Sequence, residues 1–116
     1  MKGLVPAALA VLIVAGGASE AKPRGARCSV KTAGAPDYQG PCRFSPEEKG
    51  SFTIEPLGRR AFGEDVASIT ASMVSPGLAE VRGLTREGIN SRWGEARRSK
   101  RDRACWLGSD FSICVY

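Results

Sequence analysis

The sequence predicts an all-β fold, a small antiparallel meander that forms a sandwich or a partly open barrel and is held by two disulfides. Three observations support this prediction. Several short segments alternate between apolar and polar residues, with the period of two that a half-buried strand requires. Turn-forming residues such as Gly, Pro and Asp recur between these segments. The four cysteines form an even set in a short chain, which indicates a disulfide framework in an exported protein.

The first 21 residues are expected to be a cleavable signal peptide. Lys2 precedes an uncharged run over residues 3–15, and Ser19 and Ala21 then occupy the small-residue positions of a cleavage site. Pro6 interrupts this run, which is too short for a membrane anchor of roughly 20 apolar residues. We therefore expect residues 22–116 to form a single β domain, periplasmic or secreted, with no membrane span.

The first half of this domain is predicted to contain a hairpin followed by further strands. Residues 28–32 and 41–45 are short strands joined by a turn-rich loop over 33–37. Residues 50–54 alternate, with Phe52 and Ile54 on one face. Over residues 65–74 the odd positions from 67 to 73 are apolar; a helix is the competing interpretation, and the β-branched residues favour a strand. Ser-Pro-Gly then turns the chain into a strand over 78–84.

Residues 89–99 fit a strand better than a helix. As a strand, this segment places Trp93, Glu95 and Arg97 on one side and Gly94 and Ala96 on the other, and Gly94 suits a β-bulge. A helix here would be short, basic and broken by Gly94. Because the surrounding segments are all predicted to form a meander, we favour the strand.

The last predicted hairpin aligns Cys105 with Cys114. If residues 109–110 form its turn, Trp106 faces Ile113 and the two cysteines occupy a non-hydrogen-bonded pair. The Cα atoms of such a pair are about 4.5 Å apart, a distance that a disulfide can just span. The same register gathers the apolar residues of this hairpin on the opposite, core-facing side: Trp106, Phe111, Ile113 and Val115.

By elimination Cys28 would pair with Cys42, although the sequence alone leaves the two other connectivities open. A metal site is not expected, because the chain has no Cys-x-x-Cys motif and no histidine. The lack of histidine also excludes hydrolases that need an imidazole beside the nucleophile. A glycosidase needs only two carboxylates, but the adjacent acidic residues are expected to be solvated turn residues: Glu47, Glu48, Glu64 and Asp65. We therefore expect neither an enzyme nor a cofactor.

The net charge of +5 is concentrated in one stretch. Between residues 82 and 103 there are eight basic side chains and three acidic ones, whereas the rest of residues 22–116 is neutral. Arginine side chains bind phosphate and carboxylate groups, and a tryptophan can stack on a sugar. We therefore predict a polyanion-binding surface that contains Arg92, Trp93, Arg97, Arg98, Lys100, Arg101 and Arg103. The alternative is a solvated turn that only maintains solubility.

Four motifs resemble a group of small secreted bacterial proteins of unassigned function. They are Tyr38-x-Gly40-x-Cys42-x-Phe44, Gly50-Ser51-Phe52-x-Ile54, Gly88-Ile89-Asn90-Ser91-Arg92-Trp93-Gly94 and Ala104-Cys105-Trp106-x-Gly108-x-x-Phe111-x-Ile113-Cys114. This resemblance implies export and disulfides and says nothing of activity. In size and all-β pattern the chain is also similar to the periplasmic inhibitors of c-type lysozyme, although it carries no inhibitor-loop motif.

The expected partner is an anionic polymer of the cell envelope or anionic lipid headgroups, bound without catalysis. Nucleic acid is not expected in this compartment. The alternative function is inhibition of a hydrolase such as lysozyme, but these lysozymes are strongly basic and would repel a partner of charge +5. Basic residues gathered on one exposed face with Trp93 would favour polyanion binding, whereas scattered charges and a protruding loop over 33–39 would favour an inhibitor.

Overall fold

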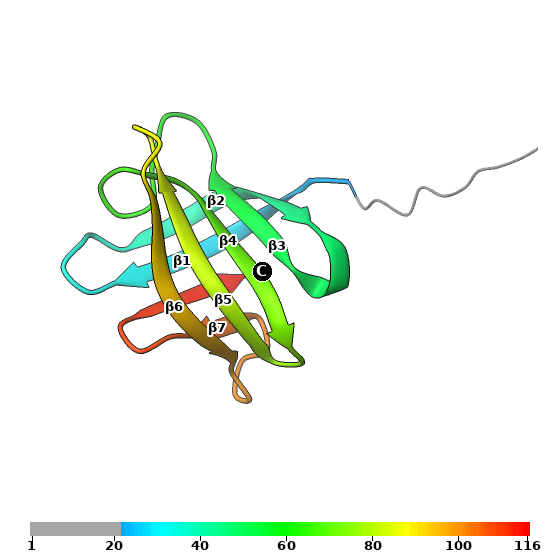
Figure 1. Ribbon diagram of the computed structural model, residues 1–116. Coiled ribbons are helices and arrows are strands. Elements are labelled where there is room, and N and C mark those ends of the chain that lie inside the picture. Colours follow the sequence, from blue (N-terminus) through cyan, green and yellow to red (C-terminus); the bar gives the residue numbers. More distant parts are fainter. Residues whose placement is uncertain (1–21) are drawn as a thin grey trace, which may run out of the picture.

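The computed structural model describes residues 22–116, so the expected signal peptide lies outside the described residues. The described residues form eight antiparallel strands and one short 3-10 helix, η1. The bounds are β1 Arg24–Thr32, β2 Tyr38–Pro46, η1 Glu48–Gly50, β3 Phe52–Pro56, β4 Val66–Ser75, β5 Leu78–Thr85, β6 Asn90–Arg98, β7 Cys105–Leu107 and β8 Phe111–Val115. The all-β prediction is confirmed (Figure 1).

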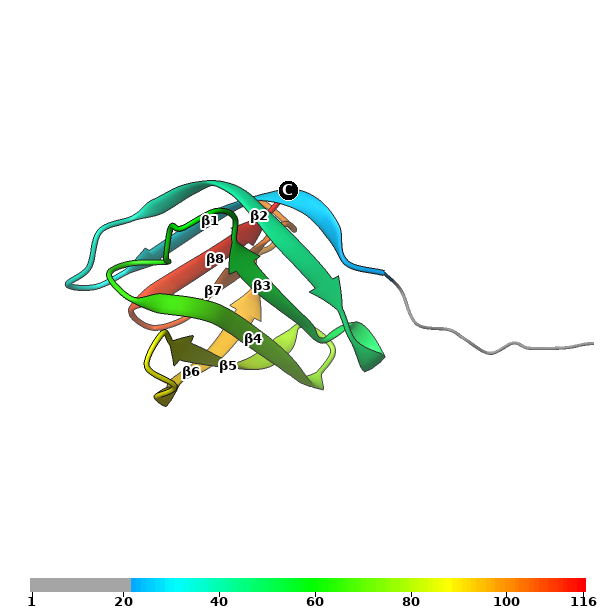
Figure 2. The ribbon, with the colours of Figure 1, turned by 90° about the horizontal axis from the view of Figure 1, so that it is seen from above.

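Each strand pairs with the next one in the chain, and β1 also pairs with β8, so the sheet closes into a barrel. The closing register runs from Cys28 opposite Val115 to Thr32 opposite Phe111. Closure gives every strand two neighbours and so removes the exposed sheet edges that promote aggregation. Figure 2, turned by 90° from Figure 1, shows the strands wrapped around a common interior. The predicted meander is confirmed, and pairing of its first and last strands closes it.

Alternation along the strands fills this interior with apolar side chains. On β4, Ile69 and Ala71 face inward and are fully buried, whereas Thr70 and Ser72, which alternate with them, face outward, as predicted. Phe62 is also fully buried, although it belongs to the β3–β4 loop, residues 57–65. Its ring meets that of Tyr38 edge-on, with the ring centroids 4.9 Å apart. The β3–β4 loop therefore seals one end of the core.

The disulfide between Cys28 and Cys42 lies inside the barrel. In the β1·β2 register Cys28 is opposite Gly40 and Cys42 is opposite Ala26, so the bridge runs diagonally between the two strands. The Cα atoms of the two cysteines are 5.8 Å apart, and both residues are buried with the core. The pairing that the sequence predicts by elimination is confirmed.

The disulfide between Cys105 and Cys114 lies directly across β7 and β8. The two residues are opposite each other, with a Cα–Cα distance of 4.0 Å. Trp106 is opposite Ile113, and both are buried on the inner face. Because successive residues of a strand alternate, this bridge lies on the outer side of the barrel. The predicted register and the predicted pairing are both confirmed.

Residues 89–99 contain the favoured strand, and its bulge lies at the predicted glycine. Val81 of β5 is opposite Gly94, whereas Arg82 is opposite Arg92, so Trp93 is the extra residue of the bulge. Gly94 has a φ angle of 116°, a conformation that glycine adopts at little cost and other residues avoid.

This bulge places Trp93 on the inner side of the barrel. The indole lies over Gly83, where a Cβ atom would be only 2.8 Å from Nε1, and its ring centroid is 5.5 Å from that of Phe111. The prediction that Trp93 shares a side with Glu95 and Arg97 is therefore wrong. A bulge inserts one residue into the strand and so reverses the alternation on one side of it.

Candidate functional site

The structure divides the seven predicted binding residues between different parts of the barrel. Five of them lie at the end of β6 and in the β6–β7 loop, residues 99–104, and we call this group the basic end: Arg97, Arg98, Lys100, Arg101 and Arg103. All five are exposed. Figure 1 shows the β6–β7 loop, in orange, projecting from one end of the barrel, with the β5–β6 turn, in yellow, at the opposite end.

Hydrogen bonds order the backbone of the β6–β7 loop. The Ser99 hydroxyl oxygen accepts from the N–H groups of Arg101 at 3.1 Å and Asp102 at 3.2 Å. The Cys105 N–H donates to the Asp102 carbonyl at 2.9 Å, and the Ser99 N–H donates to the Cys105 carbonyl at 2.9 Å. The disulfide at Cys105 ties this loop to β8. The backbone that carries the basic side chains of this loop is therefore ordered.

Asp102, the acidic residue of this loop, is occupied by internal hydrogen bonds. Its Oδ2 accepts from the Tyr116 hydroxyl at 2.6 Å, and its Oδ1 accepts from the Ala104 N–H at 3.0 Å. These bonds lower the pKa of Asp102 below its usual value, with the Tyr116 bond as the larger cause. The same bond raises the pKa of Tyr116. The Asp102 carboxylate is thus directed toward Tyr116 and Ala104.

Arg98 is held against the end of the core. Its Nε donates to the Arg103 carbonyl at 2.7 Å, and its guanidinium carbon is 5.3 Å from the ring centroid of Trp106. This distance lies within the range of about 6 Å for a cation–π contact. Arg98 therefore joins β6, the β6–β7 loop and a buried tryptophan while it remains exposed.

Arg92 and Trp93 do not join the basic end. Arg92 forms an ion pair with Glu80 on the neighbouring strand β5, so its charge is already matched. Trp93 is half-buried and packs against the core on the inner side of the barrel, apart from the exposed side chains of the basic end. There it lines a hollow of about 310 Å³ together with Thr32, Ala33, Arg92, Asp110 and Phe111.

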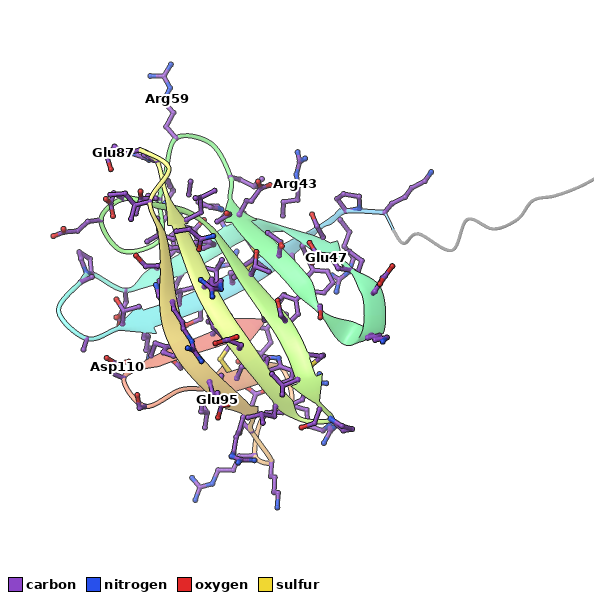
Figure 3. The ribbon with its side chains drawn as sticks, viewed as in Figure 1. Arg43, Glu47, Arg59, Glu87, Glu95 and Asp110 are labelled. Atoms are coloured by element: carbon purple, nitrogen blue, oxygen red, sulfur yellow. A yellow bond between two sulfur atoms is a disulfide. The ribbon has the colours of Figure 1, made fainter. Side chains whose placement is uncertain are left out.

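A second basic group, which the sequence analysis missed, surrounds an open hollow of about 650 Å³ on the barrel surface. Its charged lining consists of Arg43, Glu55, Arg59, Arg60 and Arg86. Figure 3 shows Arg43 and Arg59 extending outward at the end of the barrel that also carries Glu87. The adjacent pair Arg59-Arg60 is the one local signal of this group, because the other two arginines come from distant segments.

The candidate carboxylates lie at opposite ends of the barrel. Glu47 and Glu48 precede β3, whereas Glu64 and Asp65 precede β4, which runs antiparallel to β3. Glu47 accepts a hydrogen bond from the Thr53 hydroxyl at 2.9 Å. Within residues 22–116, no group of three His, Cys, Asp or Glu residues could hold a metal ion. No helix in this part of the chain is long and apolar enough to cross a membrane.

Comparison with known proteins identifies no relative of the chain. No protein-family model matches it, and no curated protein and no solved structure is significantly similar to it. The basic end and the arginine-lined hollow of about 650 Å³ are both groups of charged side chains that the fold brings together.

Proposed function

We propose that residues 22–116 are a non-enzymatic binding module for an anionic component of the cell envelope, and that the basic end makes the contact. The observation that carries this proposal is a set of five exposed cations without carboxylate partners. Among the described residues the one ion pair joins Arg92 to Glu80, and the Asp102 carboxylate is bonded to Tyr116 and Ala104. The charge of the basic end is therefore available to a ligand.

The braced loop supports this proposal further. Binding costs less free energy when the contacting groups are already ordered, because fewer degrees of freedom are lost. The β6–β7 loop is held by the Ser99 hydrogen bonds, by the Arg98 contact with Trp106 and by the disulfide at Cys105. Arginine also offers a planar set of N–H donors that matches phosphate and carboxylate oxygens. A polymer that repeats such anions could contact several of these side chains at once.

The disulfides support an oxidising compartment, the periplasm or the extracellular medium. Both bridges join neighbouring strands, Cys28 to Cys42 and Cys105 to Cys114, and the described residues contain no free cysteine. In these compartments the abundant anionic partners are envelope polymers and lipid headgroups. Nucleic acid is a less suitable partner for the same reason.

Inhibition of a hydrolase is the alternative function. The five clustered cations favour polyanion binding, whereas the separation of Trp93 from them does not. An inhibitor of this kind would use the β1–β2 loop, residues 33–37, as a protruding element. This loop extends beyond the strands in Figure 1. It is anchored at its first residue, where the Ala33 N–H donates to the Asp110 carbonyl at 3.1 Å, and Ala35 lines a small hollow together with Phe62 and Gly63.

The experiment compares two charge-reversal variants of residues 22–116 on an isolated envelope fraction. Lys100, Arg101 and Arg103 are replaced by Glu in one variant, because within residues 22–116 their side chains make no hydrogen bond, ion pair or cation–π contact. We expect this variant to lose its retention while it keeps the circular dichroism of the parent. Retention of the parent should also fall steeply between about 50 and 200 mM salt, because binding releases counterions.

The matched control carries Arg27→Glu, Lys31→Glu and Arg82→Glu, which change the net charge equally at exposed positions outside the basic end. It should keep most of the retention. Equal loss from both variants would show that total charge alone matters and would overturn the assignment to the basic end. If the parent binds a purified lysozyme tightly and the lysozyme loses its activity, the result would favour the inhibitor function instead.

A further inference from the structure

The arginine-lined hollow exists because β3 and β4 separate. Their pairing runs from Phe52 opposite Ala71 to Ile54 opposite Ile69 and ends there. Beyond this point β4 bulges at Ala67, and β3 gives way to the β3–β4 loop. The resulting gap opens on the outer surface as the hollow of about 650 Å³, with Ala67 in its lining. β-Bulges are common beside functional sites, where they redirect the chain.

Segments that are distant in the sequence supply the charged side chains around this hollow. Arg43 comes from β2, Arg59 and Arg60 come from the β3–β4 loop, and Arg86 comes from the turn after β5. Glu55 of β3 is the one carboxylate of the lining. Four guanidinium groups against one carboxylate give the lining a net charge of +3. Within residues 22–116 none of these five side chains belongs to an ion pair.

Arg60 is positioned by an aromatic ring and a glycine. Its guanidinium carbon is 4.3 Å from the ring centroid of Tyr38, a cation–π distance. Its Nη1 would lie only 2.6 Å from a Cβ atom at Gly40, so the absence of a side chain there makes room for the guanidinium. Neither contact neutralises the charge of Arg60, which remains exposed to solvent.

Arg86 is positioned by the backbone of the β3–β4 loop. Its side chain donates a hydrogen bond to the Arg59 carbonyl, and its backbone N–H donates to the Asp65 carbonyl at 2.9 Å. These two bonds join the turn after β5 to the loop that carries Arg59 and Arg60. The guanidinium of Arg86 is thus fixed relative to the loop that carries Arg59 and Arg60.

We propose that this hollow binds a phosphate-bearing ligand, either a soluble phosphate ester or a lipid headgroup. A phosphate monoester, such as the headgroup of phosphatidic acid, carries a charge of about −1.5 to −2 and three terminal oxygens, and it can accept N–H donors from several arginines at once. A carboxylate has two oxygens, which one arginine can already occupy. The volume of the hollow falls within the range of small-molecule sites, roughly 300 to 1,000 Å³. This site does not depend on the basic end, which lies at the other end of the barrel (Figure 1).

The test uses inorganic pyrophosphate as the probe and isothermal titration calorimetry on residues 22–116. The variant replaces Arg43 and Arg59 by Gln, because the side chains of these two residues make no hydrogen bond or cation–π contact in the described structure. We expect the parent to bind pyrophosphate and the variant to bind it at least about tenfold more weakly, since each charge-assisted hydrogen bond contributes roughly that factor or more. Unchanged circular dichroism shows that the variant is folded.

The matched control is Arg27→Gln with Lys31→Gln, which removes two exposed charges outside both the hollow and the basic end. It should bind pyrophosphate like the parent. Equal weakening by both double variants, or a parent that does not bind pyrophosphate, would overturn the proposal. The proposal that the basic end binds the envelope is tested separately. If that proposal is wrong, the variant with Glu at Lys100, Arg101 and Arg103 is still retained on the envelope fraction.

Co-sedimentation with vesicles distinguishes the two sources of phosphate. Vesicles of phosphatidylcholine with phosphatidic acid present a phosphate monoester headgroup, and vesicles of phosphatidylcholine alone serve as the reference. Binding to the first type that is lost in the Arg43 and Arg59 variant assigns the site to a lipid headgroup. Pyrophosphate binding without such vesicle binding assigns it to a soluble phosphate ester.

Discussion

The Tyr116 hydroxyl donates a hydrogen bond of 2.6 Å to Asp102 Oδ2 and thereby joins the residue after β8 to the loop of the basic end. The backbone N–H of Tyr116 also donates to the Arg27 carbonyl at 2.8 Å, beside the β1·β8 pairing that closes the barrel. Tyr116 therefore links barrel closure to the loop that carries the exposed cations.

Replacement of Tyr116 by Phe should raise the pKa of Asp102 toward its ordinary value of about 3.9, because the hydroxyl bond is the larger of the two causes that lower it. A carboxyl ¹³C NMR titration of the parent and the variant measures this change. The Ala104 N–H bond is expected to keep part of the shift in the variant. An unchanged midpoint would mean that the hydroxyl does not bond Asp102 in solution.

The same bond predicts a pH-dependent contribution to stability. The folded pKa of Asp102 is lowered, so this contribution is complete above the unfolded value of about 3.9 and is lost as the pH falls through the folded pKa. The folded pKa of Tyr116 is raised, so the contribution is complete below about 10 and is lost as the pH rises through the folded pKa. The difference in melting temperature between the parent and Tyr116→Phe should therefore be largest near neutral pH and shrink at both extremes.

Removal of the inner disulfide should destabilise the barrel more than removal of the outer one. The sequence separations are 14 for Cys28 with Cys42 and 9 for Cys105 with Cys114, and the chain-entropy model assigns about 3 kcal/mol to each loop. Alanine at Cys28 and Cys42 also leaves a void among buried neighbours, which adds a packing cost. Urea unfolding of the two double-alanine variants gives the comparison. Equal losses would show that the buried sulfurs add nothing beyond the cross-link.

Trp106→Ala should cost about 3 to 5 kcal/mol of unfolding free energy. Trp106 is 5% exposed, contacts the ring of Phe52 with a centroid distance of 6.4 Å and supports the guanidinium of Arg98. The neighbouring Leu107 is 49% exposed, so Leu107→Ala provides a control that should change the stability by only about 0.5 kcal/mol. Chemical denaturation measures both variants, and similar values for the two would contradict the burial of Trp106.

Gly83→Ala should displace Trp93 from its place inside the barrel. A Cβ atom at this position would lie 2.8 Å from Nε1 of Trp93, so the rigid indole has to move. We expect a loss of about 1 to 3 kcal/mol from this overpacking and a red shift of the tryptophan emission as the ring becomes exposed. Gly25→Ala, where nothing lies within 4 Å, is the control and should show neither effect. An unshifted emission spectrum would contradict the inward position of Trp93.

Several features of the fold could be predicted from the sequence because they depend on neighbours along the chain. The hairpin that aligns Cys105 with Cys114 follows from the length of its turn and the alternation of its strands. The strand over residues 66–75 follows from its period of two, and the bulge in β6 follows from Gly94. The basic end could likewise be predicted, since its five members lie within seven consecutive positions of the sequence.

Other features depend on pairings between distant segments, which no local pattern encodes. β1 and β8 are far apart in the chain, so their pairing, which closes the barrel, could be seen only in the three-dimensional structure. The side on which Trp93 lies depended on which β6 residue has no partner on β5, and the pattern in the sequence alone assigned Trp93 to the wrong side.

The sequence by itself determined the all-β meander, the register that aligns Cys105 with Cys114 and the position of the basic end, because alternation and turn length are properties of short segments. The structure then settled which cysteines pair. The tertiary structure alone decided that Arg43, Arg59, Arg60 and Arg86 surround one hollow. These arginines meet because β3 and β4 diverge beyond Ile54 and Ile69 and because the turn after β5 bonds to the β3–β4 loop. The consecutive pairing of β2 to β5 and the two bonds of Arg86 hold these segments side by side, so their charges gather around one hollow.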